Sequence, residues 1–212
     1  MFISAFLFIG PASFGQDPTR FEGEIKELLS TIPKNDQQPN IVFTGSSSIR
    51  FWPELDKAFD GVKALNLGFG GSQTSDLIHY ADELIISHNP SKIFIYEGDN
   101  DVAAGKSTAQ ILFDFKVLID YIRQFQSDSP IYIISPKPSI ARWNLKDNYL
   151  DVNNELKDLC SKSKGLQYID VWTPMCDASG QVKQDIFIQD NLHMNEKGYA
   201  IWKEVIEPFV NQ

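Results

Sequence analysis

Short apolar runs alternate along this chain with longer amphipathic segments, and this alternation restricts the fold more than any other feature. The apolar runs predict five strands, at residues 40–44, 62–67, 92–96, 131–135 and 166–171. Most of these runs are nearly continuous in apolar residues, which is typical of parallel strands covered on both faces. Strands separated by amphipathic helices form βαβ units. The sequence therefore predicts an α/β fold, a three-layer α/β/α sandwich with a five-stranded parallel sheet.

Capping residues and apolar periodicity locate the helices. Helices are predicted to start at Asp17-Pro18, at Thr74 or Ser75, at Ser107 and at Asn195. A further helix is predicted over residues 146–162. Ser107 also has the capping-box spacing to Gln110. Apolar residues that recur at helical spacing after these starts are predicted to lie in the core: Phe21, Ile25, Leu28, Leu29, Ile32, Leu77, Tyr80, Ala81, Leu84, Ile85, Ile111, Phe115, Leu118, Ile122, Phe125, Ile201, Trp202, Val205 and Phe209.

The length of 212 residues and the composition predict one globular domain, over residues 16–212. Hydrophobic residues make up 42% of the chain and charged residues 22%, which excludes a disordered or fibrous protein. The formal net charge of −9 comes without a Lys/Arg cluster and argues against a nucleic-acid partner or an anionic membrane surface. No apolar run approaches the length of a bilayer span, so stable membrane insertion is not expected.

The N-terminal segment has the composition of a signal peptide. Residues 1–15 carry no charge, residues 2–9 are strongly apolar, and small residues at Ser13 and Gly15 suit cleavage before Gln16. The basic residues that normally precede the apolar run are missing, and a buried N-terminal strand is the alternative. A cleaved signal predicts an exported protein, either periplasmic or secreted.

Two cysteines, Cys160 and Cys176, form neither a metal-binding motif nor a redox CxxC pair. Export would allow them to form a disulfide. Two buried free thiols are an equally good interpretation of the sequence.

Ligands of parallel sheets bind at the carboxyl ends of the strands, so the loops there are candidate functional segments. Residues 45–50 place a glycine and three serines at a strand-to-helix turn, where a serine can stand at the sheet edge; a serine-rich helix cap is the alternative. Residues 66–74 are rich in glycines, whose amides can face a ligand. A dinucleotide fingerprint is excluded there because Gln73 stands where its last glycine is needed.

The loop at residues 97–101 follows the third predicted strand. It resembles part of a calcium loop, but Ala103 and Gly105 occupy positions that should supply ligands, so no metal site is predicted. The Asn100 side-chain amide is instead a candidate oxyanion donor. A solvated turn rich in Asn and Asp is the alternative.

Asp190 precedes His193 by three residues, which allows a carboxylate to fix the tautomer of a histidine base. The other two histidines, His79 and His88, lie in or beside a predicted amphipathic helix and are interpreted as solvated.

Four short blocks in this order resemble the SGNH hydrolase superfamily, the GDSL-type esterases and lipases. The blocks are Gly45-Ser46-Ser47, Asn66-x-Gly68-x-x-Gly71, Gly98-x-Asn100-Asp101 and Asp190-x-x-His193. The resemblance covers essentially residues 41–212, and the first two blocks look most like the platelet-activating-factor acetylhydrolase-like or lysophospholipase-like branch. It implies the flavodoxin-like SGNH hydrolase fold. The chain departs from the family pattern at Ser46, where an aspartate is usual, and at Ser48, where Ile or Leu is usual.

The resemblance implies a serine esterase that needs no cofactor and hydrolyses carboxylic esters through an acyl-enzyme intermediate. Ser47 would be the nucleophile, His193 the base, and Asp190 the residue that orients it. The oxyanion would be held by the backbone amides of Ser47 and Gly71 and by the side chain of Asn100.

The substrate is less tightly constrained. Residues 136–148 follow the fourth strand, and Arg142 and Trp143 within them are candidate substrate-binding residues for a carboxylate or a sugar ring, although such a pair more often packs locally. No long insertion suggests an apolar lid, which favours a short acyl group. The expected partner is a small-molecule ester, either an acetylated carbohydrate or a lipid ester.

Two alternatives remain at this point. One is a lysophospholipase or thioesterase of the same fold. The other is a non-catalytic flavodoxin-like module that binds a phosphate-bearing ligand or nucleotide, which would explain residues 68–71 but leave Asp190 and His193 without a role. The sequence does not specify the oligomeric state.

Overall fold

The computed structural model describes residues 17–32 and 41–212. The predicted signal segment at residues 1–15 and the predicted strand residue 40 lie outside the described residues. Five strands form one sheet: β1 (Ile41–Gly45), β2 (Ala64–Gly68), β3 (Lys92–Tyr96), β4 (Ile131–Ile134) and β5 (Leu166–Ile169). All pairs are parallel and the order is β2-β1-β3-β4-β5, which confirms the predicted five-stranded parallel sheet. The start of β2 and the end of β5 lie inside the predicted ranges.

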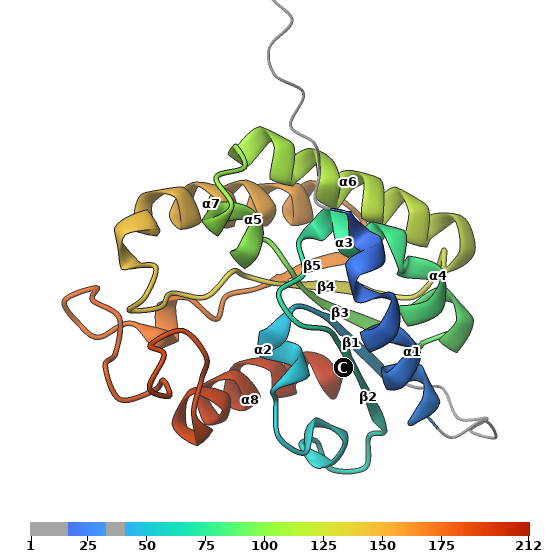
Figure 1. The fold of residues 1–212 in the computed structure, drawn as a ribbon, viewed down its shortest axis with the longest axis horizontal. Coiled ribbons are helices and arrows are strands. Elements are labelled where there is room, and N and C mark those ends of the chain that lie inside the picture. Colours follow the sequence, from blue (N-terminus) through green and yellow to red (C-terminus); the bar gives the residue numbers. More distant parts are fainter. Residues whose placement is uncertain (1–16, 33–40) are drawn as a thin grey trace, which may run out of the picture.

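Helices cover both faces of the sheet (Figure 1). One face carries α1 (Glu22–Ser30), α3 (Thr74–His79), α4 (Ala81–Leu84), α5 (Asp99–Ala103), α6 (Thr108–Phe125) and α7 (Lys146–Lys162), and the other carries α2 (Ser47–Arg50) and α8 (Glu196–Val210). Short 3-10 turns lie at η1 (Pro18–Phe21), η2 (Leu55–Lys57), η3 (Ile86–His88), η4 (Trp143–Leu145) and η5 (Thr173–Met175). The predicted three-layer α/β/α sandwich is therefore confirmed.

Successive strand residues point into two separate apolar clusters, because side chains alternate across a sheet. On β1, Val42 belongs to the cluster that includes the buried residues of α6 and α7, whereas Ile41 and Phe43 belong to the cluster that includes those of α2 and α8. On β3, Phe94 joins the second cluster, where it stacks on Phe43 with ring centroids 4.4 Å apart. Both sides of each central strand are thus buried, which explains the continuous apolar runs in the sequence.

Some local predictions differ from the structure. Phe125 is 55% exposed and not part of the core, because it lies on the last turn of α6. Ser107 accepts a hydrogen bond from the Gln110 amide at 3.2 Å, but the Gln110 side chain bonds to Asp114, so only half of the capping box forms. The helix predicted from Thr74 is interrupted at Tyr80.

Two further findings concern the whole molecule. Cys160 and Cys176 are both free, so the structure has two thiols rather than a disulfide between them. Within the described ranges, no helix has the length and apolarity needed to cross a membrane.

The sheet order places three strand ends side by side. Gly45 at the end of β1 pairs with Gly68 of β2 on one side and Tyr96 of β3 on the other. The loops that follow these strands therefore meet at one edge of the sheet. This is the edge where an α/β sheet binds its ligands.

Candidate active site

Ser47 is the first residue of α2, immediately beyond the end of β1. Gly45 has φ +119°, and a Cβ there would lie 2.0 Å from the Tyr96 carbonyl oxygen, so only glycine fits this turn. The flanking Ser46 and Ser48 are 2% and 3% exposed, whereas Ser47 is partly exposed. The turn thus offers one of the three serines to solvent.

His193 connects Ser47 to Asp190. The His193 Nε2 lies 3.0 Å from Ser47 Oγ, and its Nδ1 lies 2.6 Å from Asp190 Oδ2. With the imidazole proton on Nδ1, the ring donates to the carboxylate and accepts from the serine hydroxyl. This is the geometry of a nucleophile, a base and the group that orients the base.

A tight turn holds the two residues together. Asp190 Oδ1 accepts hydrogen bonds from the backbone amides of Leu192 and His193, both at 2.9 Å. Asn191 between them adopts the left-handed conformation with φ +58°, which asparagine tolerates better than most residues. Partial burial would raise the pKa of Asp190, but the hydrogen bonds from His193 and Leu192 lower it to about 2. Asp190 is therefore ionised at neutral pH and can accept the hydrogen bond from the His193 Nδ1.

The candidate oxyanion donors come from the loops after β2 and β3. Gly71 has φ +70° and lies in the turn that follows β2. Asn100, in the first turn of α5, donates through Nδ2 to the Ser72 carbonyl at 2.8 Å. This bond uses one of the two amide hydrogens of Asn100 and leaves the other for a ligand. The Asn100 amide is thereby tied to the loop that carries Gly71.

Acidic residues beneath this loop are buried rather than solvated. Glu97 accepts a hydrogen bond from Ser72 Oγ at 2.6 Å, and its Oε2 has no partner among the described residues. Burial and the nearby Asp101 raise the pKa of Glu97 well above its usual value, so its neutral form is favoured. Asp101 accepts the Thr74 amide at 3.0 Å and pairs with Lys106 at 2.7 Å.

The sequence interpretation missed these structural carboxyl groups. It treated Asn100 in residues 97–101 as a candidate oxyanion donor, with a solvated turn as the alternative, and did not foresee that Glu97, Asp99 and Asp101 are buried. The described part of the chain contains no cluster of His, Cys, Asp or Glu suited to a metal ion. The continuous apolar run of β3 leading directly into the loop was the available signal that its first residues would be buried.

Arg142 and Trp143, the candidate substrate-binding residues, make different contacts. Arg142 Nη1 donates to Asp99 Oδ1 at 2.5 Å and its Nη2 donates to Asn100 Oδ1 at 3.0 Å. Trp143 stacks on Trp172 with ring centroids 6.1 Å apart. Arg142 therefore lies at the candidate oxyanion donor, and Trp143 takes part in local aromatic packing.

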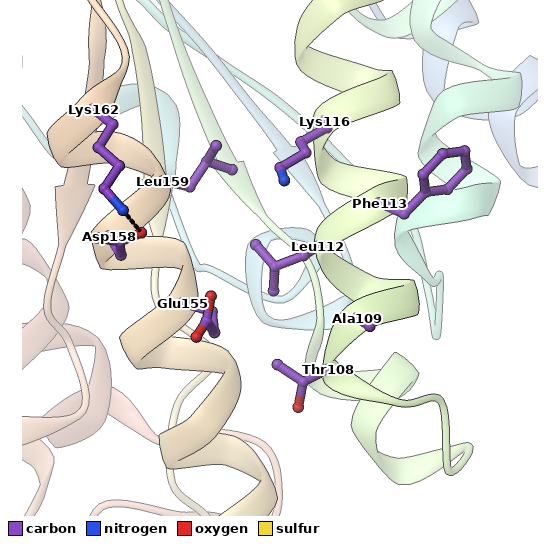
Figure 2. Close-up of a pocket in the computed structure, with 9 residues that line it drawn as sticks. All are labelled: Thr108, Ala109, Leu112, Phe113, Lys116, Glu155, Asp158, Leu159 and Lys162. Carbon is purple, nitrogen blue, oxygen red and sulfur yellow. Dashed lines mark hydrogen bonds and ion pairs between the residues drawn. The ribbon is translucent and has the colours of Figure 1, made fainter.

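Two surface hollows differ in their relation to this site. A hollow of about 510 Å³ includes Phe51, whose ring lies 5.1 Å from the His193 imidazole, and is lined by Phe51, Pro53, Ile188, Met194, Asn195, Glu196, Lys197 and Tyr199. Another of about 710 Å³ lies between α6 and α7, where Leu112 of α6 and Leu159 of α7 point toward each other (Figure 2). Ser47, Asp190 and His193 line neither hollow, but only the first includes a residue in contact with one of them.

The remaining histidines lie outside the triad. His79 is exposed at the end of α3. His88 is partly buried, with its Nε2 3.0 Å from the Glu83 carbonyl oxygen.

Comparison with known proteins identifies the class. Residues 15–201 match the model of the GDSL-like lipase/acylhydrolase family. Since the match covers most of the chain, the protein belongs to this family. Family membership favours an acylhydrolase over the alternative of a non-catalytic flavodoxin-like module.

A curated relative shares part of its length with this chain. N-acylneuraminate cytidylyltransferase of Escherichia coli O18:K1:H7 is 26% identical over 180 residues, which cover 82% of this chain and 41% of the relative. The chain thus spans about two-fifths of the length of that relative.

Solved structures share the fold. A Streptococcus pneumoniae protein named for platelet activating factor superposes with a TM-score of 0.80 at 21% identity, covering 89% of this chain and 92% of that one. An acylhydrolase of Bacteroides fragilis has a TM-score of 0.70 at 19% identity, covering 91% and 95%. A catalytic mutant of an acetylxylan esterase from Geobacillus stearothermophilus has a TM-score of 0.67 at 13% identity, covering 81% and 94%.

Proposed function

We propose that the protein hydrolyses short-acyl esters, in particular acetyl esters of carbohydrates, through an acyl-enzyme intermediate on Ser47. The observation that carries this proposal is the continuous chain of hydrogen bonds from Asp190 through His193 to Ser47, with lengths of 2.6 Å and 3.0 Å. We also propose that the protein is exported, on the composition of residues 1–15.

Acylation begins with attack of Ser47 Oγ on the ester carbonyl carbon. His193 Nε2 takes the hydroxyl proton as the new C–O bond forms, and Asp190 stabilises the resulting imidazolium. The tetrahedral oxyanion accepts hydrogen bonds from the backbone amides of Ser47 and Gly71 and from the free N–H of Asn100. His193 then returns the proton to the alcohol oxygen as the ester C–O bond breaks.

Deacylation repeats these steps with water. His193 takes a proton from the water that attacks the acyl-enzyme, and the same donors hold the second oxyanion. Collapse of this intermediate breaks the bond to Ser47 Oγ, which recovers its proton from His193. The products are the alcohol and the carboxylic acid, and no cofactor takes part in these steps.

A short acyl group is favoured by how the loop after β4 is held. Residues 136–139 are buried, and the Ala141 amide donates to the Asn191 carbonyl at 3.0 Å. This loop is therefore packed down against the His193 turn and does not resemble an apolar lid over a long chain.

The alcohol half of the substrate has an amphipathic surface available. His193 must reach the leaving oxygen to protonate it, so the alcohol lies on the His193 side of Ser47. Phe51 and Ile188, which are 50% and 49% exposed, border His193 there, and the Phe51 ring lies 5.1 Å from the imidazole. An aromatic face with a polar rim suits a sugar ring. The names of two similar proteins also contain carbohydrates, acetylxylan in one and N-acylneuraminate in the other.

Active-site labelling tests the nucleophile. A fluorophosphonate probe is expected to label Ser47, as located by peptide mass spectrometry, because only Ser47 is activated by His193. Ser47→Ala should lose both labelling and hydrolysis. Ser46→Ala and Ser48→Ala are the matched controls, and loss of labelling in either one with retention in Ser47→Ala would overturn the assignment.

An ester panel tests the substrate. We expect kcat/KM for p-nitrophenyl esters to fall by about tenfold or more between acetyl and octanoyl, and acetylated sugars to be hydrolysed. Faster release of fatty acid from lysophospholipids than of acetate from acetylated sugars would favour the lysophospholipase alternative and contradict the proposal.

A further inference from the structure

Asp99 is a buried carboxylate that accepts hydrogen bonds from several side chains at once. Arg142 Nη1 and the Tyr149 hydroxyl each lie 2.5 Å from Asp99 Oδ1, and the Tyr96 hydroxyl lies 2.7 Å from its Oδ2. Lys137 Nζ lies 3.6 Å from Oδ2. Burial would raise the pKa of Asp99, but Lys137 and Arg142 lower it to about 2, so Asp99 is ionised at neutral pH.

Arg142 connects this carboxylate to the candidate oxyanion donor. Its second guanidinium nitrogen, Nη2, donates to Asn100 Oδ1 at 3.0 Å. Since arginine is only a donor, this contact fixes the carbonyl end of the planar amide. With Nδ2 held by the Ser72 carbonyl at 2.8 Å, the remaining N–H of Asn100 has a defined direction. Without Arg142 the amide can turn over and present oxygen to the oxyanion, which repels it.

Lys137 connects the same carboxylate to the catalytic turn. Its side chain is buried, and Nζ donates to the Leu192 carbonyl at 2.7 Å. Leu192 lies between Asp190 and His193, so this hydrogen bond fixes the backbone of the turn that carries both residues. A buried ammonium is expensive to desolvate, and apolar residues commonly replace buried ion pairs without loss of stability. Its presence at this position therefore favours a role in the site.

We propose that Asp99, Arg142 and Lys137 form a buried charged frame that fixes the Asn100 amide relative to the His193 turn, which makes Arg142 and Lys137 positioning residues for ester hydrolysis. This inference rests on the proposed function. Its importance follows from the narrow tolerance of the chemistry, because an oxyanion donor must lie about 2.7–3.1 Å from the developing charge. Without the frame, the Asn100 donor and the base can shift independently of each other.

Variants of Arg142 test the first half of the frame. Arg142→Lys keeps a cation beside Asp99 but lacks the fork that also reaches Asn100. We expect kcat for p-nitrophenyl acetate to fall by about tenfold or more, with KM within about twofold. In an Asn100→Ala background, which should itself lose about a hundredfold in kcat, Arg142→Lys should cause no further loss beyond about twofold, because there is no amide left to orient.

A matched arginine separates positioning from folding. Arg123 is a partly buried arginine that donates to the carbonyls of Gln126, Ser129 and Gly165, near the opposite, amino ends of β4 and β5. Arg123→Lys should lower the thermal unfolding midpoint without changing kcat. Equal multiplicative losses for Arg142→Lys with and without Asn100 would show a merely structural role and overturn the proposal. A rise in KM alone would assign Arg142 to substrate binding and overturn it as well.

Lys137 has its own matched control. Lys92 also donates from a partly buried position to backbone carbonyls, those of Phe209 and Val210, but at the amino end of β3. Lys137→Met should lower kcat by about tenfold while KM changes little, and Lys92→Met should leave kcat unchanged. Unchanged kcat in a folded Lys137→Met protein would overturn this half of the frame.

The two levels of proposal fail in different ways. Hydrolysis that survives Ser47→Ala would overturn the proposed function itself. Hydrolysis that is lost in Ser47→Ala but remains fully active in Arg142→Lys and Lys137→Met would overturn only the buried frame.

Discussion

Individual residues at this site are assigned by burial and hydrogen bonding rather than by residue type. Three adjacent serines are chemically equal in the sequence, but Ser46 and Ser48 are buried and Ser47 meets His193. Asp190 likewise has two roles, since one oxygen faces the imidazole and the other holds the backbone of the turn. The role of each side chain therefore depends on whether it is exposed and on which of its atoms already form hydrogen bonds.

The two oxygens of Asp190 predict unequal mutant effects. We expect His193→Ala to abolish the base and lower kcat by about 10⁴-fold or more, and Asp190→Ala to be milder by at least about tenfold because the base itself remains. Asp190→Asn keeps an acceptor for the turn amides but places an amide group beside Nδ1, which favours the wrong tautomer. Steady-state kinetics on p-nitrophenyl acetate measures all three.

The remaining histidines are the control for this series. His79→Ala and His88→Ala should retain the kcat of the unmodified protein, since neither contacts the triad. Equal losses for Asp190→Ala and His193→Ala would instead mean that the pair works as a strict unit.

The buried Glu97 predicts a pH dependence of stability. Its pKa is raised by burial and by Asp101, so the folded state holds a proton that the unfolded chain releases above about pH 4.3. Glu97 therefore contributes stability below that pH, and the contribution is lost as pH rises toward its folded pKa. Glu97→Gln has no carboxyl group to ionise and so avoids the loss of stability at high pH. The urea midpoint of this variant minus that of the unmodified protein should therefore be larger at pH 8 than at pH 4.5.

An exposed glutamate serves as the comparison for Glu97. Glu204 lies on the solvent side of α8. Glu204→Gln should show a difference in urea midpoint that is independent of pH over the same range. A Glu97→Gln difference that is equally flat would contradict the buried neutral carboxyl group.

Secondary-structure elements were the most predictable level. The apolar runs identified all five strands, and their continuity identified the sheet as parallel and covered on both faces. Element ends were less accurate, because Gln110 bonds to Asp114 rather than completing the cap, and Tyr80 interrupts a helix that periodicity treats as continuous. Such details depend on neighbours that periodicity does not contain.

The β1-to-α2 turn predicts a strong effect of a small substitution. Gly45→Ala would place a Cβ 2.0 Å from the Tyr96 carbonyl oxygen, in addition to requiring φ +119°. We expect a loss of at least about 3 kcal/mol in the free energy of unfolding, measured in urea. Gly61→Ala also requires a positive φ, +70°, but its Cβ would meet nothing within 4 Å. Its loss should be only about 1–2 kcal/mol, and equal losses at the two positions would contradict the steric argument.

At the scale of the whole molecule, the sheet order brings distant loops to one edge. Ser47 and His193 are 146 residues apart in sequence, and Arg142 and Asn100 are 42 apart. Two apolar clusters, each built from segments far apart in the sequence, lie on opposite faces of the sheet. The site is thus a product of the assembled domain and not of any one segment.

The signal-peptide composition of residues 1–15 predicts that the N-terminal segment is not needed for hydrolysis. A chain beginning at Gln16 is expected to unfold cooperatively and to keep kcat/KM for p-nitrophenyl acetate within about twofold of the full-length chain. In a host that exports the full-length protein, N-terminal sequencing of the mature product should begin at Gln16. Retention of residues 1–15 on the exported product would contradict the predicted cleavage.

The sequence by itself determined the order of elements and the fold class, and it indicated the four candidate blocks of the site. These depend on local periodicity, on capping residues and on short motifs, all of which lie within a few residues of one another. The tertiary structure decided which serine is accessible, that Cys160 and Cys176 remain thiols, and that Glu97 is buried. It also placed Arg142 against Asn100. Burial and long-range pairing arise only when segments far apart in the chain pack together, so no local pattern contains them.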